Sequence, residues 1–296
     1  MNSPFSPTEP VFQCVPNFSE GRRPEVLAAL VDSIRATPGA VLLDHSADPD
    51  HNRCVLTYLG NPEAILAATL AVAQVATSRI DLSLHQGVHP RTGAMDVLPV
   101  VPLRNAGREE AVTLAHALGS ALTSQLHLTV FYYDWAAPPE APVTLPELRK
   151  RVLGGDTRHP TPDTRLLTTP GIVLVGARGP LVAYNINLET TEVGIAKAIA
   201  KRIREEREQR RELSGVRALG LFLTSQHCAQ VSMNLTQPTV TPLPEVFDFV
   251  TAEAKRLGVT VRESEVIGVI PEVALGGQPP EAILWHAYRP SQILEI

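Results

Sequence analysis

The sequence predicts an α+β protein made of two ferredoxin-like subdomains, each with the order βαββαβ, whose sheets face each other across a substrate cleft. The same alternation of short apolar strands and amphipathic helices occurs once in each half of the chain. A length of 296 residues suits about two domains. A proline-rich stretch, residues 138–170, lies between the two runs and is expected to be a linker or lid with one short helix, 145–152.

The first half begins after a polar, proline-rich segment, residues 1–10, which is expected to be a flexible tail. Pro24 suits the first turn of a helix, and Asn61 followed by Pro62 supplies an N-cap and an N1 proline for another. The predicted elements in chain order are strand Val11–Val15, helix Pro24–Ala36, strands Ala40–Asp44 and Cys54–Leu59, helix Asn61–Ser78, strand Asp96–Val101, helix Glu109–Leu126 and strand Leu128–Tyr133.

The second half repeats the order. Thr190 or Thr191 is a candidate N-cap, and Gly258 is a C-terminal stop signal. The repeated order of elements divides the chain into two predicted subdomains, residues 11–179 and 180–296. The predicted elements are strand Leu181–Ile186, a helix from Thr190 or Thr191 to Arg204, strands Val216–Leu223 and Ala229–Leu235, helix Leu243–Leu257 and strand Val259–Glu263.

The composition is that of an ordinary globular protein, with 44% hydrophobic and 19% charged residues. The net charge of −5 argues against a nucleic-acid partner. No apolar run approaches the roughly 20 residues of a membrane helix, and the N-terminus lacks the apolar region of a signal peptide. The scattered Cys14, Cys54 and Cys228 predict free buried thiols. We therefore expect a cytoplasmic protein without a nucleic-acid or membrane partner.

A polar segment, residues 85–96 (HQGVHPRTGAMD), carries the side chains best suited to chemistry. It holds two imidazoles, a guanidinium and a carboxylate in a loop shaped by glycine and proline. His85 and His89 have the spacing of a helical zinc pair, but the intervening glycine and following proline disfavour a helix, and no HExxH pattern occurs. No metal is expected. Catalysis is favoured for His89, whereas His85 is equally well explained by a hydrogen bond to loop backbone.

Further polar clusters lie at predicted strand ends. Residues 17–22 and 48–53 contain more donors and acceptors than a turn requires, although turn formation alone explains many of them. Two pairs of polar residues occupy alternate strand positions and so share a face, where they line the cleft or face water: Asn185 and Asn187, and Ser232 and Asn234. There is no GxGxxG, GxxxxGK[ST] or GxSxG pattern, so nucleotide binding through a glycine loop and a serine hydrolase have no support.

Several long segments have the specificity of family motifs. They are CVPNFSEG at 14–21, LLD with a following NR at 42–60, HPRTGAMDV at 89–97, VGAR at 175–178, NINL at 185–188 and QVSMNL at 230–235. In order, from about Phe12 to Leu275, they resemble the motifs of the glutamate formimidoyltransferase (formiminotransferase) family.

The resemblance implies transfer of the formimino group of N-formimino-L-glutamate to the co-substrate tetrahydrofolate, a late step of histidine degradation. It also implies two stacked subdomains with a substrate tunnel, usually in a homodimer, and no metal. The catalytic histidine of the HPR motif corresponds to His89. Vertebrate members carry a fused cyclodeaminase domain, and this chain is expected to lack one. The family's folate-contacting segment corresponds to Pro162, Asp163, Thr164, Arg165, Leu166, Leu167, Thr168, Thr169, Pro170 and Gly171.

Some residues depart from the family pattern. The family's PDxGP is shortened to the residues 162–165, Ile172 stands in place of alanine, and Gln237 replaces a customary acidic residue. These departures concern the expected folate segment and leave His89 untouched.

We expect the remaining site residues to support His89 as a general acid and base. Asp44, Asp50 or Asp96 orients the imidazole or pairs with the amidinium of the donor. Arg53, Arg91 and Arg178 are candidates for the substrate carboxylates, because a guanidinium binds a carboxylate through two hydrogen bonds. The candidate cleft residues are Asn17, Ser19, Glu20, Arg178, Asn185, Asn187, Ser232 and Asn234.

Three other functions stay open at this point. A folate-dependent glutamate formyltransferase would use the same fold and residues with a formyl donor. A non-catalytic folate-binding module would bind folate without turnover. A metalloenzyme would contain a bound metal.

Overall fold

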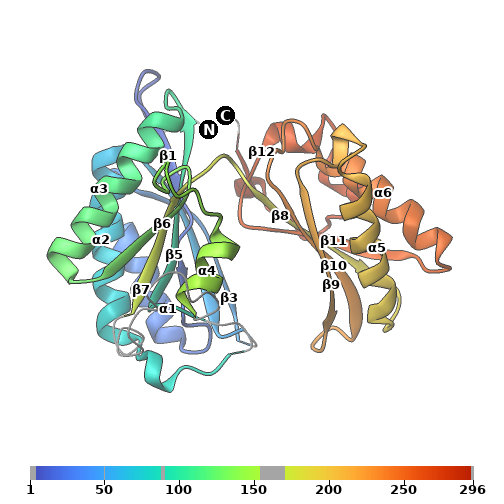
Figure 1. Cartoon of the computed structure of the whole chain (residues 1–296), viewed down its shortest axis with the longest axis horizontal. Helices are drawn as coiled ribbons and strands as arrows, with labels where there is room; N and C mark the ends of the chain where they lie inside the picture. Colours follow the sequence, from blue (N-terminus) through green and yellow to red (C-terminus); the bar gives the residue numbers. More distant parts are fainter. Residues whose placement is uncertain (1–4, 50, 88–90, 154–170, 295–296) are drawn as a thin grey trace. The chain divides into compact units, whose positions relative to one another are not determined.

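The computed structural model describes residues 5–49, 51–87, 91–153 and 171–294. The chain divides into two compact units, Met1–Arg178 and Gly179–Ile296 (Figure 1). Each unit has its own hydrophobic core.

The sheet of the first unit combines an antiparallel part with a parallel extension. Its strands are β1 (Val11–Cys14), β2 (Asn17–Phe18), β3 (Val41–Asp48), β4 (Arg53–Gly60), β5 (Met95–Arg104), β6 (Thr129–Asp134) and β7 (Ile172–Ala177). β5, β1, β4 and β3 lie in that order and are antiparallel, as in a ferredoxin-like fold. β7 pairs in parallel with both β5 and β6, and so extends the sheet beyond β5.

Helices cover both faces of this sheet (Figure 1). They are α1 (Pro24–Arg35), α2 (Pro62–Arg79), α3 (Arg108–Leu126) and α4 (Leu145–Val152). The first three pack on one face over the larger core, and α4 packs on the other face over a smaller one. Alternate residues of β5 and β7 therefore enter different cores: Leu98 and Val173 face the large core, Val97 and Leu174 the small one. α2 begins where the sequence predicts, because Asn61 Oδ1 accepts a hydrogen bond from the Ala64 N–H at 2.9 Å.

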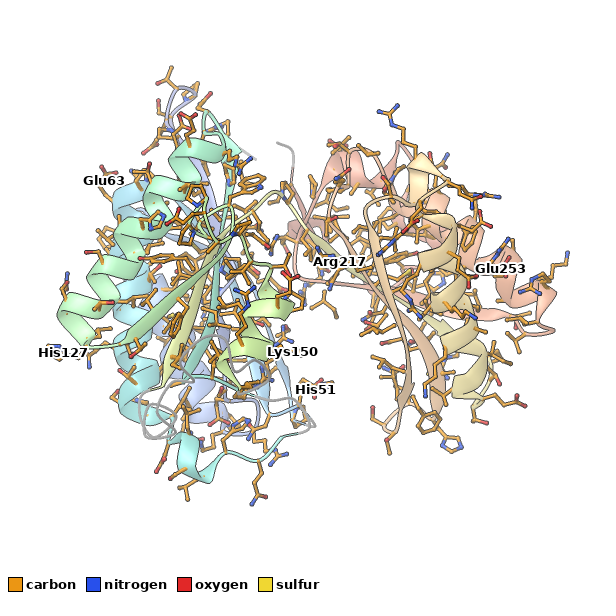
Figure 2. The ribbon with its side chains drawn as sticks, in the orientation of Figure 1. His51, Glu63, His127, Lys150, Arg217 and Glu253 are labelled. Atoms are coloured by element: carbon orange, nitrogen blue, oxygen red, sulfur yellow. The ribbon has the colours of Figure 1, made fainter. Side chains whose placement is uncertain are left out.

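The second unit is a four-stranded antiparallel sheet with two helices. Its elements are β8 (Val182–Leu188), α5 (Val193–Glu206), β9 (Val216–Leu223), β10 (Cys228–Leu235), α6 (Leu243–Arg256) and β11 (Val261–Ile267). The strand order β11-β8-β10-β9 is the ferredoxin-like order. Both helices pack on one face of the sheet. Figure 2 shows Glu253 on α6 and Arg217 on the opposite face of the sheet. A short parallel pair, β12 (Ile270–Pro271) and β13 (Ile293–Leu294), follows.

The predicted α+β class with two ferredoxin-like subdomains is confirmed, and the substrate cleft stays a prediction. The last long strand begins later than predicted and continues to Ile267. The cause is the end of α6, where Gly258 has a φ of +79° and the Val259 N–H bonds to the Ala254 carbonyl, so that Val259 belongs to the helix cap. β7 was not among the predicted elements.

Side-chain hydrogen bonds hold the described part of the N-terminal segment. Arg104 donates to the Ser6 carbonyl at 2.9 Å, and Asn105 donates to the carbonyls of Pro7 and Glu9. Within the described ranges, no helix is both long enough and apolar enough to span a bilayer.

Candidate active site

The carboxylate of Asp96, the second residue of β5, is the centre of the site. The side chain is fully buried. Oδ1 accepts hydrogen bonds from the backbone N–H and the hydroxyl of Thr92, at 2.9 and 2.7 Å. Oδ2 accepts from Arg149 Nη2 at 2.7 Å and lies 3.4 Å from Arg91 Nη1. Asp96 therefore binds the end of the HPRTG loop to helix α4.

Two arginines, Arg91 and Arg53, lie in this cluster beside Asp96. The Arg91 side chain is 4% exposed, and its other hydrogen-bond contact among the described residues is a 3.4 Å approach of Nη2 to the His51 carbonyl. Arg53, the first residue of β4, lies close enough for charge repulsion with Arg91. Burial, followed by this repulsion, lowers the pKa of Arg53 to about 10. Burial also lowers the pKa of Arg91, and the charge of Asp96 opposes the shift.

The backbone closes the same loop on its other side. Gly93 and Gly171 form an isolated antiparallel bridge, and the Ile172 N–H donates to the Thr92 carbonyl at 2.7 Å. Gly171 has a φ of +86°, and a Cβ there would lie 2.6 Å from Gly93 Cα. Glycine is therefore required at this crossing. Gly171 and Ile172 thus contact Thr92 and Gly93 directly, whereas α4 is connected to them through Asp96.

Asn52 connects three loops at the edge of the site. Its φ of +48° is in the left-handed region, which asparagine tolerates better than most residues. Its Oδ1 accepts from the Gly21 N–H at 2.9 Å. Its Nδ2 donates to the Gln86 carbonyl at 3.1 Å and lies 3.4 Å from His85 Nδ1. The loop after β2, the β3–β4 turn and the loop after α2 are thus held together.

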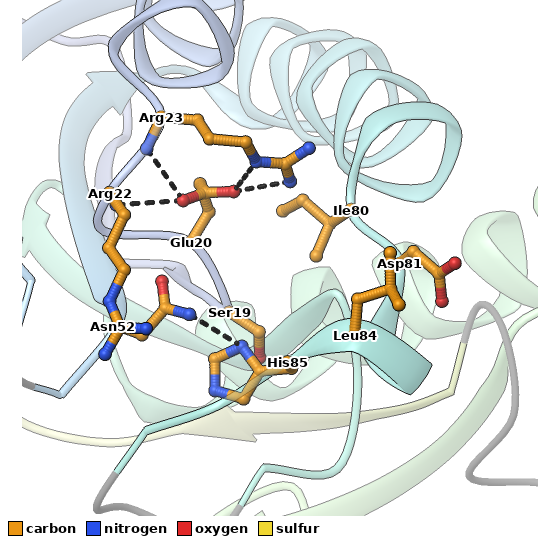
Figure 3. Close-up of a pocket in the computed structure, with 9 residues that line it drawn as sticks. All are labelled: Ser19, Glu20, Arg22, Arg23, Asn52, Ile80, Asp81, Leu84 and His85. Carbon is orange, nitrogen blue, oxygen red and sulfur yellow. Dashed lines mark hydrogen bonds and ion pairs between the residues drawn. The ribbon is translucent and has the colours of Figure 1, made fainter.

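A pocket of about 270 Å³ lies beside Asn52 (Figure 3). Its floor includes Glu20, whose carboxylate accepts hydrogen bonds from the backbone N–H groups of Arg22 and Arg23 and from the Arg23 guanidinium. Burial alone would raise the pKa of Glu20, but these hydrogen bonds outweigh it and the pKa is lowered. The pocket is lined by Ser19, Glu20, Arg22, Arg23, Asn52, Ile80, Asp81, Leu84 and His85.

His85 lies at the wall of this pocket. Burial lowers its pKa, and the nearby positive charge of Arg91 adds to the effect. The imidazole is therefore neutral at pH 7, and Nδ1 can accept the hydrogen bond from Asn52.

The structure brings several predicted residues of the first unit to this region. Ser19 donates its hydroxyl proton to the Gly93 carbonyl at 2.7 Å. Asn17 donates to the Val15 carbonyl, a local turn contact. Asp44 is buried in β3. Arg178 follows β7, is half-buried and has a side-chain hydrogen bond with Tyr133 of β6.

The remaining predicted site residues of this unit lie outside the described residues. They are His89, Asp50 and the part of the expected folate segment from Pro162 to Pro170.

In the second unit, the predicted polar residues meet on the sheet face away from the helices. Asn185 lies opposite Ser232, and Asn187 opposite Gln230. Asn234, two positions beyond Ser232, is exposed on the same face. Asn185 donates to Glu265 at 2.9 Å, and Asn187 donates to Glu263 at 3.0 Å.

Sequence reasoning missed Arg149, Gln230, Glu263 and Glu265. The last two alternate along β11, but the predicted strand ended at residue 263, so their shared face was not visible. Gln230 precedes Ser232 by two residues, and the same alternation could have identified it. Arg149 lies in a short helix of the proline-rich stretch, 53 residues from its partner Asp96, and no local pattern connects the two.

No group of three or more His, Cys, Asp or Glu side chains suitable for a metal ion occurs in the described part of the chain.

These features define an α+β protein of two ferredoxin-like units, with a polar loop site on the first. The chain matches the N-terminal subdomain of the formiminotransferase domain over residues 11–178, and the formiminotransferase domain over residues 183–277. It belongs to the formiminotransferase family.

Among its relatives, the glutamate formimidoyltransferase of Streptococcus pyogenes serotype M1 is 36% identical over 273 residues, which cover 90% of each chain. The glutamate formimidoyltransferase of Thermoplasma acidophilum is also 36% identical, over 89% of each chain. The formimidoyltransferase-cyclodeaminase of Gallus gallus is 40% identical over 89% of this chain and 50% of its own length. The chain thus spans about half of the two-activity relative and nine tenths of the other two.

Substitution of Asp96 by asparagine is expected to reduce the free energy of unfolding by about 3–5 kcal/mol, because Arg91 and Arg149 lose their buried counter-charge. Urea unfolding measures the change. Asp32→Asn, at an exposed position of α1, is the matched control and should stay within about 0.5 kcal/mol of the parent. A loss below about 1 kcal/mol for Asp96→Asn would contradict the central role of this carboxylate.

The lowered pKa of His85 predicts a pH-dependent stability. As the pH falls below about 6.5, the unfolded chain binds the proton before the folded chain does, so stability decreases until the folded pKa is passed. Urea midpoints between pH 7.5 and 5.0 should therefore fall more steeply for the parent than for His85→Gln. The exposed His286→Gln should follow the parent. Equal slopes for the parent and His85→Gln would refute the prediction.

Proposed function

We propose that this chain is a glutamate formimidoyltransferase, which transfers the formimino group of N-formimino-L-glutamate to tetrahydrofolate and releases glutamate. The observation that carries the proposal is the 36% identity, over nine tenths of both chains, with two proteins named for this activity. The contacts of Asp96 with Thr92, at the end of the HPRTG motif, and with Arg149 support it, because they satisfy a fully buried carboxylate.

The chemistry requires one proton to move between two nitrogens. N5 of tetrahydrofolate attacks the formimino carbon, and a tetrahedral intermediate forms. The bond from that carbon to the glutamate nitrogen then breaks, and N5 loses a proton while the leaving amine gains one. A single imidazole serves both steps, and we assign this role to His89.

Three carboxylates, Asp44, Asp50 and Asp96, are candidates for orienting His89, and Asp50 lies outside the described residues. All the described contacts of Asp96 go to Thr92, Arg91 and Arg149, which favours a role in holding the loop. We therefore assign the orienting role to Asp44, a buried residue of β3.

The second unit belongs to the same proposal. Its open sheet face carries Asn185, Asn187, Ser232 and Asn234, and we assign these residues to substrate binding together with Ser19, Glu20 and the segment Pro162–Gly171 for folate. The amide groups of Asn185 and Asn187 are held by Glu265 and Glu263, which fixes their orientation for a ligand.

The proposal includes a homodimer in the cytoplasm, supported by the family resemblance. Light scattering of the purified chain should give about twice the chain mass of 32.0 kDa. A mass of one chain at micromolar concentration would contradict the dimer and leave the activity untouched.

The His89→Ala variant is expected to lose about 10² to 10⁴ in kcat, the usual contribution of general acid–base catalysis. The measurement is formation of 5-formiminotetrahydrofolate from formiminoglutamate and tetrahydrofolate. His286→Ala replaces an exposed histidine and should keep the parent rate.

Parallel assays separate the rival functions. Turnover of N-formylglutamate in preference to formiminoglutamate would indicate the formyltransferase. Tight tetrahydrofolate binding without turnover by the parent would indicate a binding module. A loss of less than tenfold in His89→Ala, with an active parent, would remove His89 from its assigned role.

A further inference from the structure

The guanidinium of Arg53 is the least satisfied charge in the described part of the chain near the site. No described residue accepts a hydrogen bond or forms an ion pair with it, and its Nε is fully buried. Arginine is rarely buried without a partner, because removing a cation from water is costly. The absence of a partner among the described residues suggests that a ligand supplies one.

Arg91 is a second incompletely satisfied guanidinium beside it. Its Nε is also buried without a described hydrogen-bond partner. Its contacts to Asp96 and to the His51 carbonyl are both 3.4 Å long, longer than the 2.7–2.9 Å of strong charge-assisted hydrogen bonds. Asp96 has its shorter contact with Arg149, so it neutralises Arg91 only in part.

The two guanidiniums repel one another, and repulsion from Arg91 contributes to the lowered pKa of Arg53. The charges of three guanidiniums, Arg53, Arg91 and Arg149, lie near only two carboxylates that act on Arg53, Asp96 and Asp48. This excess of positive charge attracts an anion. A planar guanidinium fork matches a carboxylate or a phosphate, and the substrates of the proposed reaction carry carboxylates.

We propose that Arg53 and Arg91 together bind a carboxylate of the acidic donor substrate, while Asp96 and Arg149 act as positioning residues for Arg91. The inference rests on the proposed function. It separates Arg53 and Arg91 from Arg178, which has Tyr133 as a partner.

A carboxylate could come from the donor or from the glutamyl tail of the folate. The donor is favoured by distance along the chain. Arg91 follows His89 by two residues, so their Cα atoms are at most about 7 Å apart. The carboxylates of a small donor lie within a few bonds of the reacting carbon, whereas a whole aminobenzoyl group separates the folate tail from N5.

The test is a kinetic comparison of Arg53→Gln and Arg53→Lys with the parent. In Arg53→Gln, KM for formiminoglutamate should rise at least tenfold, and KM for tetrahydrofolate should stay within twofold. Arg53→Lys, which keeps the charge and loses the fork, should lie between. Arg256→Gln, an exposed arginine paired with Glu253, is the matched control and should change neither constant.

Two further measurements exclude a purely structural role. The urea midpoint of Arg53→Gln should equal or exceed that of the parent. The substitution removes a partly buried guanidinium charge that has no partner among the described residues. Calorimetry with L-glutamate should show weaker binding to Arg53→Gln than to the parent. A lower midpoint together with unchanged KM values would assign Arg53 to folding and overturn the inference.

The source of the carboxylate is tested by tetrahydropteroate, which lacks the glutamyl tail. If Arg53→Gln raised KM for tetrahydrofolate but not for tetrahydropteroate or the donor, the bound carboxylate would be that of the folate, and the inference would be wrong. Failure of the parent to turn over formiminoglutamate would instead refute the proposed function. An active parent with unchanged KM values in Arg53→Gln would refute only the present inference.

Discussion

The buried carboxylate of Asp96 is the interaction on which the site of the first unit depends. An ionised group without access to water needs several donors, and here they come from Thr92 and Arg91 on the preceding loop and from Arg149 on α4. Movement of the loop or of α4 away from β5 would leave a charge unpaired at a cost of several kcal/mol. One side chain thus couples the position of Arg91 and Thr92 to a helix within the proline-rich stretch 138–170. The backbone crossing of Gly93 and Gly171 adds a second connection that no larger residue would permit.

The sequence was sufficient to predict structural elements whose signals lie within a few neighbouring residues. Asn61 and Pro62 predict the start of α2 because a cap and an N1 proline act within one turn. The two βαββαβ runs follow from periodicity, and the observed strand orders agree with them. β7 was missed because its residues, Ile172–Ala177, are all buried and show no alternation. Its parallel partners, β5 and β6, lie far away in the sequence, and pairing of that kind leaves no pattern in the strand itself.

The sequence predicted the types of residue in the candidate site, but it did not predict which residues they contact. The sequence predicted a site in residues 85–96, and the structure shows Arg91 and Asp96 of this segment in one buried cluster. The sequence could not show that Arg149 would bond to Asp96, because the two residues are distant and the contact depends on how α4 packs against β5. It also placed Arg178 with Arg53 and Arg91 as an equivalent candidate. Only the fold shows that Tyr133 hydrogen bonds to Arg178.

Arg53 and Arg178 differ in whether the protein supplies a partner for the charge. Arg178 has one, and Arg53 is available to a ligand. Both are half-buried, but Arg178 has the Tyr133 hydroxyl as a hydrogen-bond partner, whereas Arg53 has no partner among the described residues. Arg53 begins β4 and, because side chains alternate along a strand, lies on the face opposite Cys54, Leu56 and Tyr58 of the core. An apolar residue there would avoid the desolvation of a charge. A guanidinium kept at such a place, next to two others, lowers stability without a compensating contact in the described protein. Residues that lower the stability of the folded protein are retained where function requires them. The substrate, rather than the fold, accounts for that side chain.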